Sequence, residues 1–215
     1  MNPDPKDLLV KLIKCKSVTP NDNGALSVIE DVLNANNFEC ERLPFGSGAE
    51  KVLNLFARLG DKSPHICFAG HSDVVPEGDS KLWEFSPFDG KISNGKIFGR
   101  GAVDMKGSIA SYLSAAIDWI EKNKSFEGSI SFLITGDEEG PAINGTRKVL
   151  DWMEASGKIP DMCIVGEPTN ATKVGDTIKI GRRGSLNGSL TVYGEQGHVA
   201  YPHLALNPFP KIGRS

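Results

Sequence analysis

The sequence lacks the cysteine pattern of a disulfide scaffold or a thiolate metal site. It has 4 cysteines in 215 residues, and no two of them form a C-x-x-C pair. Cys67 and Cys163 lie inside apolar runs, where a buried, reduced thiol is a simpler explanation than a disulfide or a metal ligand. Because disulfides are rare in the cytoplasm, this pattern favours a cytoplasmic protein.

The sequence also lacks a membrane-spanning segment and an excess of positive charge. The longest apolar run near the start, Leu8–Ile13, is interrupted by Lys11 and is far too short to cross a bilayer. It does not have the charged, apolar and small-residue order of a signal peptide. The formal net charge is -3 and the pI is about 5.8, which does not favour a nucleic-acid partner.

Helical and strand patterns alternate through the first part of the chain. We predict an α/β catalytic domain over residues 1–180, with a mainly parallel central sheet. The expected helices are Pro5–Lys14, Ala25–Asn36, Lys106–Ile120 and Gly145–Ala155. The expected strands are Asn54–Leu59, His65–Ala69, Ser129–Thr135 and Asp161–Val165, with a hairpin at Lys91–Phe98 around an Asn-Gly pair.

The alternation of helical and strand patterns ends after Glu167. Thr177–Ile180 and Ser185–Tyr193 are predicted strands, joined by a Gly-Arg-Arg-Gly link. We expect residues 181–215 to begin a second, α+β domain. Because the chain stops at Ser215 without completing an obvious element, we also expect it to be an N-terminal fragment.

Four polar clusters, each bracketed by glycine, occur at or near the ends of predicted strands. In open α/β sheets, ligands bind beyond the carboxyl ends of the strands, so we expect these clusters to meet at one edge. They are Gly70–Asp73, Gly99–Gly107, Gly136–Gly140 and Gly166–Pro168.

The clusters bring together one histidine and several carboxylates. Carboxylates repel one another unless a cation or a proton compensates their charge. Imidazole and carboxylate ligands suit zinc or a similar divalent ion. Because too many acidic groups converge for one tetrahedral zinc, we predict two divalent ions about 3.5–4 Å apart.

Two of the clusters, each taken alone, can also be explained by a structural role without metal binding or catalysis. His71 and Asp73 point to the same side of an extended chain, so Asp73 is placed to accept a hydrogen bond from His71 and orient it. The alternative is a loop histidine followed by a helix N-cap. Glu138 and Glu139 offer one metal ligand and one proton acceptor, although a solvated acidic turn is the usual role of such a pair. Four clusters together favour the functional interpretation.

These motifs resemble those of the di-zinc aminoacylase and carboxypeptidase superfamily, over residues from about 5 to about 212. The matching strings are Gly70–Pro76, Gly99–Gly107, Asp137–Glu139 and Gly166–Pro168. Two further stretches, Gly181–Leu186 and Gly197–Ala205, are similar to a branch that hydrolyses the succinyl amide of a diamino acid. Other branches, which include acetylornithine deacetylases and small aminopeptidases, are the alternatives.

The resemblance implies a set of metal ligands. His71 and Glu167 would bind one ion, Glu139 would bind the second, and Asp104 would bridge both. Zinc is the expected metal, with cobalt as a substitute. The peptide bond that follows Asp104 is expected to be cis.

The resemblance also implies roles in catalysis and substrate binding. Asp73 would orient His71. Glu138 would be the general base that takes a proton from the attacking water and later protonates the leaving amine. His198 would reach across the interface of a homodimer to stabilise the oxyanion. Arg182 and Arg183 would contact a carboxylate of the small-molecule substrate, with a solvated pair as the alternative.

Members of the superfamily supply a further histidine ligand from a C-terminal segment that this chain does not reach. The resemblance therefore implies an under-ligated second metal and weak or absent activity for the 215-residue chain by itself.

Overall fold

The computed structural model describes residues 3–181, 184 and 186–212. The chain divides into a larger unit, Met1–Thr169, and a smaller unit, Asn170–Ser215. The sequence-based boundary near residue 180, and the assignment of the second segment to a dimerisation domain, stay predictions.

The described residues of the larger unit form four helices longer than one turn and two sheets. The helices are α1 (Pro5–Lys14), α2 (Ala25–Asn34), α3 (Lys106–Lys122) and α4 (Thr146–Ala155). The strands are β1 (Glu39–Phe45), β2 (Val52–Leu59), β3 (His65–His71), β4 (Lys91–Ser93), β5 (Lys96–Phe98), β6 (Ser129–Thr135) and β7 (Met162–Val165). Short 3-10 turns lie at η1 (Gly48–Glu50) and η2 (Ser80–Leu82).

The main sheet is mixed, in the order β1-β2-β6-β3-β7. β3 pairs in parallel with β6 and with β7, whereas β2 is antiparallel to β6 and to β1. β4 and β5 form a separate hairpin. All seven residues of β6 are buried, because this strand lies between two others and is covered on both faces. The α/β class expected from the sequence is confirmed.

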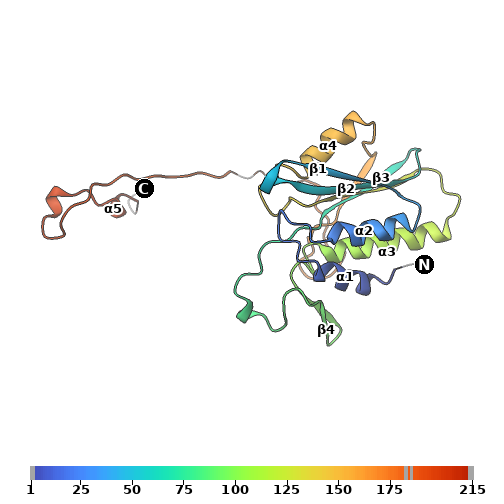
Figure 1. Cartoon of the computed structure of the whole chain (residues 1–215), viewed down its shortest axis with the longest axis horizontal. Coiled ribbons are helices and arrows are strands. Elements are labelled where there is room, and N and C mark those ends of the chain that lie inside the picture. Colours follow the sequence, from blue (N-terminus) through green and yellow to red (C-terminus); the bar gives the residue numbers. More distant parts are fainter. Residues whose placement is uncertain (1–2, 182–183, 185, 213–215) are drawn as a thin grey trace. The chain divides into compact units, whose positions relative to one another are not determined.

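Helices cover both faces of the main sheet (Figure 1). α1, α2 and α3 pack on one face, where their apolar side chains meet Phe68, Phe132 and Ile134 of the sheet. α4 packs on the other face, through Val149 and Met153. Burial of these apolar surfaces provides the main driving force for folding of this unit, at about 25 cal/mol for each Å² removed from water.

Local sequence fixes where α1 begins. The side chain of Asp4 accepts a hydrogen bond from the backbone N–H of Lys6 at 2.7 Å, and Pro5 occupies the first helical position. An N-cap of this kind is worth about 1 kcal/mol. Leu8, Leu12 and Ile13 then form the buried side of the helix, at the spacing that the sequence pattern predicts.

The parallel strands end at the same edge of the sheet. His71 at the end of β3 is in register with Thr135 at the end of β6. Ala69 of β3 is in register with Val165, the last residue of β7. The polar clusters that follow these strands are therefore brought together, as the sequence predicts.

Most predicted elements of the larger unit are present within two or three residues of their expected bounds. β1 was not predicted, because Glu39, Glu41, Arg42 and Pro44 interrupt its apolar pattern. It is an edge strand, which needs fewer apolar side chains than a central one. The sheet contains parallel and antiparallel pairs. Polar clusters lie at or just after the ends of its parallel strands, β3, β6 and β7.

The smaller unit has little regular structure among its described residues. It contains a 3-10 turn η3 (Pro202–Leu204), a short helix α5 (Phe209–Ile212) and a bridge between Glu195 and Leu206. The predicted strand Thr177–Ile180 is wrong, and no strand forms over 186–193. Residue 185 lies outside the described residues. A strand needs a hydrogen-bonded neighbour, and the described residues of this unit offer none there.

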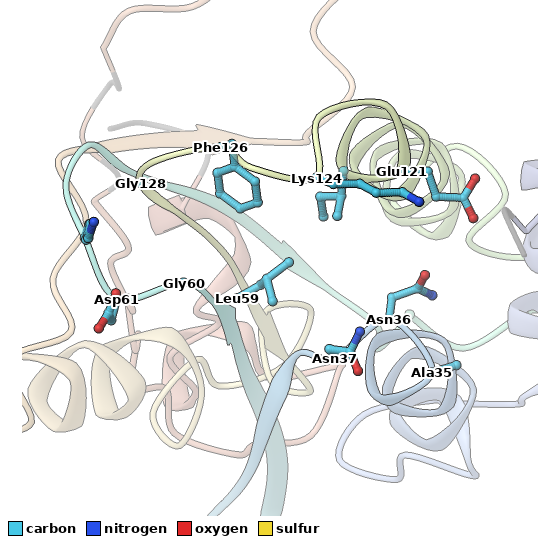
Figure 2. A pocket seen from close by; sticks show the side chains of 12 residues that line it. Ala35, Asn36, Asn37, Leu59, Gly60, Asp61, Glu121, Lys124, Phe126 and Gly128 are labelled. Carbon is cyan, nitrogen blue, oxygen red and sulfur yellow. The ribbon is translucent and has the colours of Figure 1, made fainter.

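A cavity of about 500 Å³ lies at the opposite end of the sheet from the polar clusters. Figure 2 shows its lining, which includes Leu59 at the end of β2, Gly60 after it and Phe126 before β6. The ends of α2 and α3 contribute Asn37 and Glu121.

Among the described helices, none is long and apolar enough to cross a membrane.

Candidate metal centre

His71 is the centre of the acidic cluster. Its side chain is 1% exposed, and its Nδ1 lies 2.9 Å from the backbone carbonyl oxygen of Asp73. A carbonyl oxygen can only accept, so the proton of neutral His71 sits on Nδ1 and the lone pair on Nε2 is free for a metal. Nε2 lies 3.0 Å from Asp104, 3.5 Å from Glu167 and 3.9 Å from Glu138.

Asp73 holds the loop that carries the paired glutamates. Its carboxylate oxygens accept the backbone N–H of Glu138 at 3.2 and 3.3 Å and the backbone N–H of Glu139 at 3.1 Å. The nearest carboxylate oxygen of Asp73 lies 3.6 Å from His71 Nδ1, farther than the carbonyl oxygen. The backbone of Asp73 thus contacts the imidazole while its side chain fixes the glutamates.

Asp104 lies in the loop between β5 and α3. The bond between Asp104 and Met105 is cis, as expected from the resemblance. Lys106, the first residue of α3, anchors this loop: its backbone N–H donates to Gly101 at 3.0 Å. Its Nζ donates to the carbonyl oxygens of Leu12 and Cys15, each at 2.8 Å. The loop is therefore tied to the end of α1.

Two groups of side chains have donor atoms close enough to share an ion. His71, Asp104 and Glu167 form one group, and His71, Glu138 and Glu139 form the other, with donor atoms within 4.8 Å of one another in each. Imidazole nitrogen and carboxylate oxygen are the ligands that zinc and related divalent ions take. The residues present therefore fit divalent cations.

The electrostatics of the cluster also suit a cation. Burial raises the pKa of Glu139, and the nearby carboxylate of Asp104 raises it further. Burial lowers the pKa of His71, but the carbonyl and carboxylate of Asp73 and the carboxylates of Glu167 and Glu138 outweigh it, so the net shift is upward. In both shifts the contribution of the neighbouring carboxylates reflects an excess of negative charge, which a bound cation would balance.

The structure brings six of the predicted site residues together in the larger unit. They are His71, Asp73, Asp104, Glu138, Glu139 and Glu167. Both glutamates of the pair have an oxygen near His71, so the division into a ligand, Glu139, and a base, Glu138, stays a prediction.

The other predicted site residues lie in the smaller unit or outside the described residues. His198 is exposed, and its Nδ1 accepts the backbone N–H of Ala200 at 3.1 Å. Its proposed role in a dimer stays a prediction. Arg182 and Arg183 lie outside the described residues.

Sequence patterns missed two residues that support the cluster. Asp137 is 3% exposed, and its carboxylate accepts the backbone N–H groups of Ala142, Ile143 and Asn144 at 2.9–3.1 Å. Lys106 is fully buried. A buried aspartate or lysine needs several hydrogen-bond partners, but those partners are backbone groups of a loop and of the end of α1 that no sequence spacing identifies.

The sequence profile of peptidase family M20/M25/M40 matches residues 67–208. A succinyl-diaminopimelate desuccinylase of Rhodospirillum centenum is 57% identical over 216 residues, which cover 100% of this chain and 56% of that protein. The desuccinylase of Parvibaculum lavamentivorans is 56% identical, over 97% of this chain and 53% of that protein. The chain thus spans about half the length of the curated relatives it matches.

Solved structures show the same fold at lower identity. Human carnosine dipeptidase 1 has a TM-score of 0.64 at 20% identity, covering 75% of this chain and 38% of that one. The M20 family metallo-carboxypeptidase Sso-CP2 of Sulfolobus solfataricus has a TM-score of 0.62 at 20% identity, covering 76% of this chain and 37% of that one.

Proposed function

Because the chain belongs to peptidase family M20/M25/M40, we propose that it carries the metal-binding half of an amide hydrolase that acts on N-succinyl-LL-2,6-diaminopimelate. The products are succinate and LL-2,6-diaminopimelate. This step belongs to bacterial lysine and diaminopimelate biosynthesis in the cytoplasm. The relatives of more than 50% identity that carry the desuccinylase name support this choice of substrate.

One observation carries the proposal. Nε2 of His71, which carries no proton when the imidazole is neutral because Nδ1 donates to Asp73, faces carboxylates that come from three separate loops. We assign His71 and Glu167 to one ion, Glu139 to a second and Asp104 to both, with zinc as the expected metal and cobalt as a substitute. When bound, such ions polarise the amide carbonyl and make water more acidic.

The residues of the chain then move the protons. Glu138 takes one proton from water as the water oxygen attacks the succinyl carbonyl carbon. It returns that proton to the amide nitrogen as the C–N bond breaks, which gives a carboxylic acid and an amine. The second proton of the water then passes from the acid to the more basic amine, which leaves a carboxylate and an ammonium group. The carboxylate of Asp73 accepts a hydrogen bond from the backbone N–H of Glu138, so it fixes the backbone position from which the base reaches the cluster. Partial exposure of the Glu138 side chain, at 43%, leaves it open to water.

We assign substrate recognition to the smaller unit. In this proposal His198 of a second copy donates to the oxyanion in a homodimer. Arg182 and Arg183 pair with substrate carboxylates, because the guanidinium group matches a carboxylate with two hydrogen bonds. We expect the 215-residue chain alone to turn over weakly or not at all, because it spans only part of its relatives.

The test uses a chimera in which this chain replaces the matching 216 residues of the Rhodospirillum centenum relative. We expect the chimera to hydrolyse the succinyl substrate. Glu138→Gln should abolish turnover, by at least about 10³-fold, and leave the metal content intact. Glu139→Gln should lower the metal content as well. Glu154→Gln, at an exposed position of α4, is the matched control and should behave like the parent.

Two outcomes of the same assay would contradict the proposal. Retained turnover in Glu138→Gln would refute the base assignment. Preference for N-acetylornithine or for a dipeptide over the succinyl substrate would replace the proposed substrate with that of another acyl amino acid hydrolase or of an aminopeptidase.

A further inference from the structure

Met105 has no assigned role, yet it is the residue that joins Asp104 to α3. Its side chain is fully buried and belongs to the core between the helices and the sheet. A methionine is flexible and often fills gaps in a core. The surroundings of its terminal methyl group show which gap it fills here.

The methyl group of Met105 occupies space that two glycines leave open. A Cβ atom added to Gly70 would lie 2.5 Å from Met105 Cε and 3.2 Å from its Sδ. A Cβ atom added to Gly166 would lie 2.8 Å from the same Cε, and 2.6 Å from two ring atoms of Phe68. Contacts below 3.0 Å are not tolerated without movement of one partner.

The two glycines sit directly before two of the predicted metal ligands. Gly70 precedes His71 in β3, and Gly166 precedes Glu167 after β7. The backbone N–H of Gly166 donates to the carbonyl of Ala69 at 3.2 Å, so the two strand ends are adjacent. One side chain therefore touches the backbone beside His71 and beside Glu167, and it is bonded through its own backbone to Asp104.

We propose that Met105 is a positioning residue that sets the spacing of His71, Asp104 and Glu167, so that these three side chains hold one divalent cation. The inference rests on the metal assignment of the proposed function. The methyl group of Met105 packs in the space between β3, β7 and the start of α3. A shorter side chain lets the strand ends move, and a Cβ at either glycine pushes them away from Asp104.

The test is a double-mutant cycle on the 215-residue chain with cobalt as the probe. The variants are Gly70→Ala, Met105→Ala and the combination of both. The measurements are the cobalt dissociation constant, the visible absorption spectrum of the bound cobalt and the thermal unfolding of the metal-free chain. Ile109→Ala is the matched control, because Ile109 is equally buried on α3.

We expect Met105→Ala and Gly70→Ala each to weaken cobalt binding by about 10–100-fold, the range seen when support of a metal ligand is lost. Both should also change the cobalt spectrum. In the double variant the added Cβ meets no methionine, so Gly70→Ala should cost less there than in the parent. Ile109→Ala should lower the unfolding temperature and leave cobalt affinity and spectrum unchanged.

Equal cobalt affinity in the parent, Met105→Ala and Ile109→Ala would overturn the inference. An effect of Gly70→Ala that is the same with and without Met105 would also overturn it. If Gly70→Ala does not fold, the comparison of Met105→Ala with Ile109→Ala decides alone.

A parent chain that binds no cobalt would overturn both this inference and the metal assignment. Loss of hydrolysis by the chimera, with the cobalt pattern as expected, would overturn only the proposed activity.

Discussion

At the scale of the single residue, the most constrained side chain outside the acidic cluster is Lys106. Its amine is buried, and it donates to two carbonyl oxygens at the end of α1. Burial lowers the pKa of this amine to about 8. These bonds replace the hydration that the amine loses on folding, and they link the loop of Asp104 to a helix that begins 100 residues earlier in the chain.

We expect Lys106→Met to lower the free energy of unfolding by about 1–3 kcal/mol. Removal of the amine spares the cost of burying a charge, but it removes two hydrogen bonds, and this loss is the larger effect. The carbonyl oxygens of Leu12 and Cys15 then keep only their backbone donors, the N–H groups of Cys15 and Ser17. Urea unfolding measures the difference. Lys11→Met, at an exposed position of α1, is the control. Equal or greater stability of Lys106→Met would contradict the expected balance.

His65 gives the larger unit a dependence on pH that is independent of the acidic cluster. Its side chain is buried, and its Nε2 lies 2.7 Å from the hydroxyl of Ser131. Burial lowers the pKa of His65, and the nearby Arg58 lowers it further. The native state thus binds fewer protons than the unfolded chain just below pH 6.5, the ordinary value for histidine.

We therefore expect stability to fall as the pH drops below 6.5 towards the lowered pKa of the native state. His65→Gln keeps a hydrogen-bonding group but cannot take up this proton, so its stability should fall less between pH 7.5 and pH 5. Urea unfolding at the two pH values gives the comparison, with His203→Gln at an exposed position as control. Identical pH dependence in parent and His65→Gln would exclude His65 as the source.

At the scale of the element, β7 differs from the other parallel strands because, in the part of the chain that the structure describes, a strand pairs with only one of its edges. All four of its residues are exposed. Cys163 of β7 is in register with the buried Cys67 of β3. A hydrogen bond from the thiol of Cys67 lowers the pKa of Cys163 to about 7 and leaves Cys67 with a raised pKa.

Cys163 should therefore be the first thiol to react with iodoacetamide at neutral pH, because the thiolate is the reactive form. Burial raises the pKa of Cys15, and it raises that of Cys40 to about 11, so both should react more slowly. Mass spectrometry of the labelled peptides over time measures the order. Cys163→Ser should remove the fast-reacting site. Labelling of Cys40 at the rate of Cys163 would show that the hydrogen bond does not activate the thiol.

The sequence predicts elements well where a regular pattern is buried, and poorly where order comes from distant partners. β6 has seven buried apolar or small residues bounded by glycine, and its bounds were predicted correctly. β1 was missed because its charged residues point to solvent or to ion pairs such as Arg42 with Glu30. The strand expected at Thr177–Ile180 has a suitable composition but no neighbour among the described residues to pair with.

The same distinction applies to the acidic cluster. Strand ends bring His71, Glu138 and Glu167 together, so their proximity follows from motifs and topology. The hydrogen bonds that hold these side chains in place do not follow from motifs and topology. That the carbonyl of Asp73 contacts His71 while its carboxylate binds the glutamate loop depends on loop geometry of less than 1 Å, which residue spacing does not specify.

At the scale of the whole molecule, the apolar core is confined to one of the two units. Every described apolar residue that is fully buried lies between Leu8 and Met153. In the smaller unit, Val174 and Ile180 are completely exposed. The second unit therefore adds little apolar burial to the free energy of folding of this chain.

A chain that ends at Thr169 should consequently unfold at nearly the same temperature as the 215-residue chain, within about 3 °C. Circular dichroism on heating measures both proteins. A chain that ends at Gly145, before α4 and β7, is the control and should unfold at a much lower temperature, because it loses Val149 and Met153 from the core. A fall of more than about 6 °C on ending at Thr169 would show that the second unit stabilises the first.

The confinement of the acidic cluster to the larger unit has a consequence for synthesis in the cell. Folding begins at the N-terminal end while a protein is still being translated. His71, Asp104, Glu138, Glu139 and Glu167 all precede Asn170. On the proposed metal assignment, a nascent chain can thus gather these groups, and capture metal from the surrounding pool, while the ribosome is still adding residues of the smaller unit.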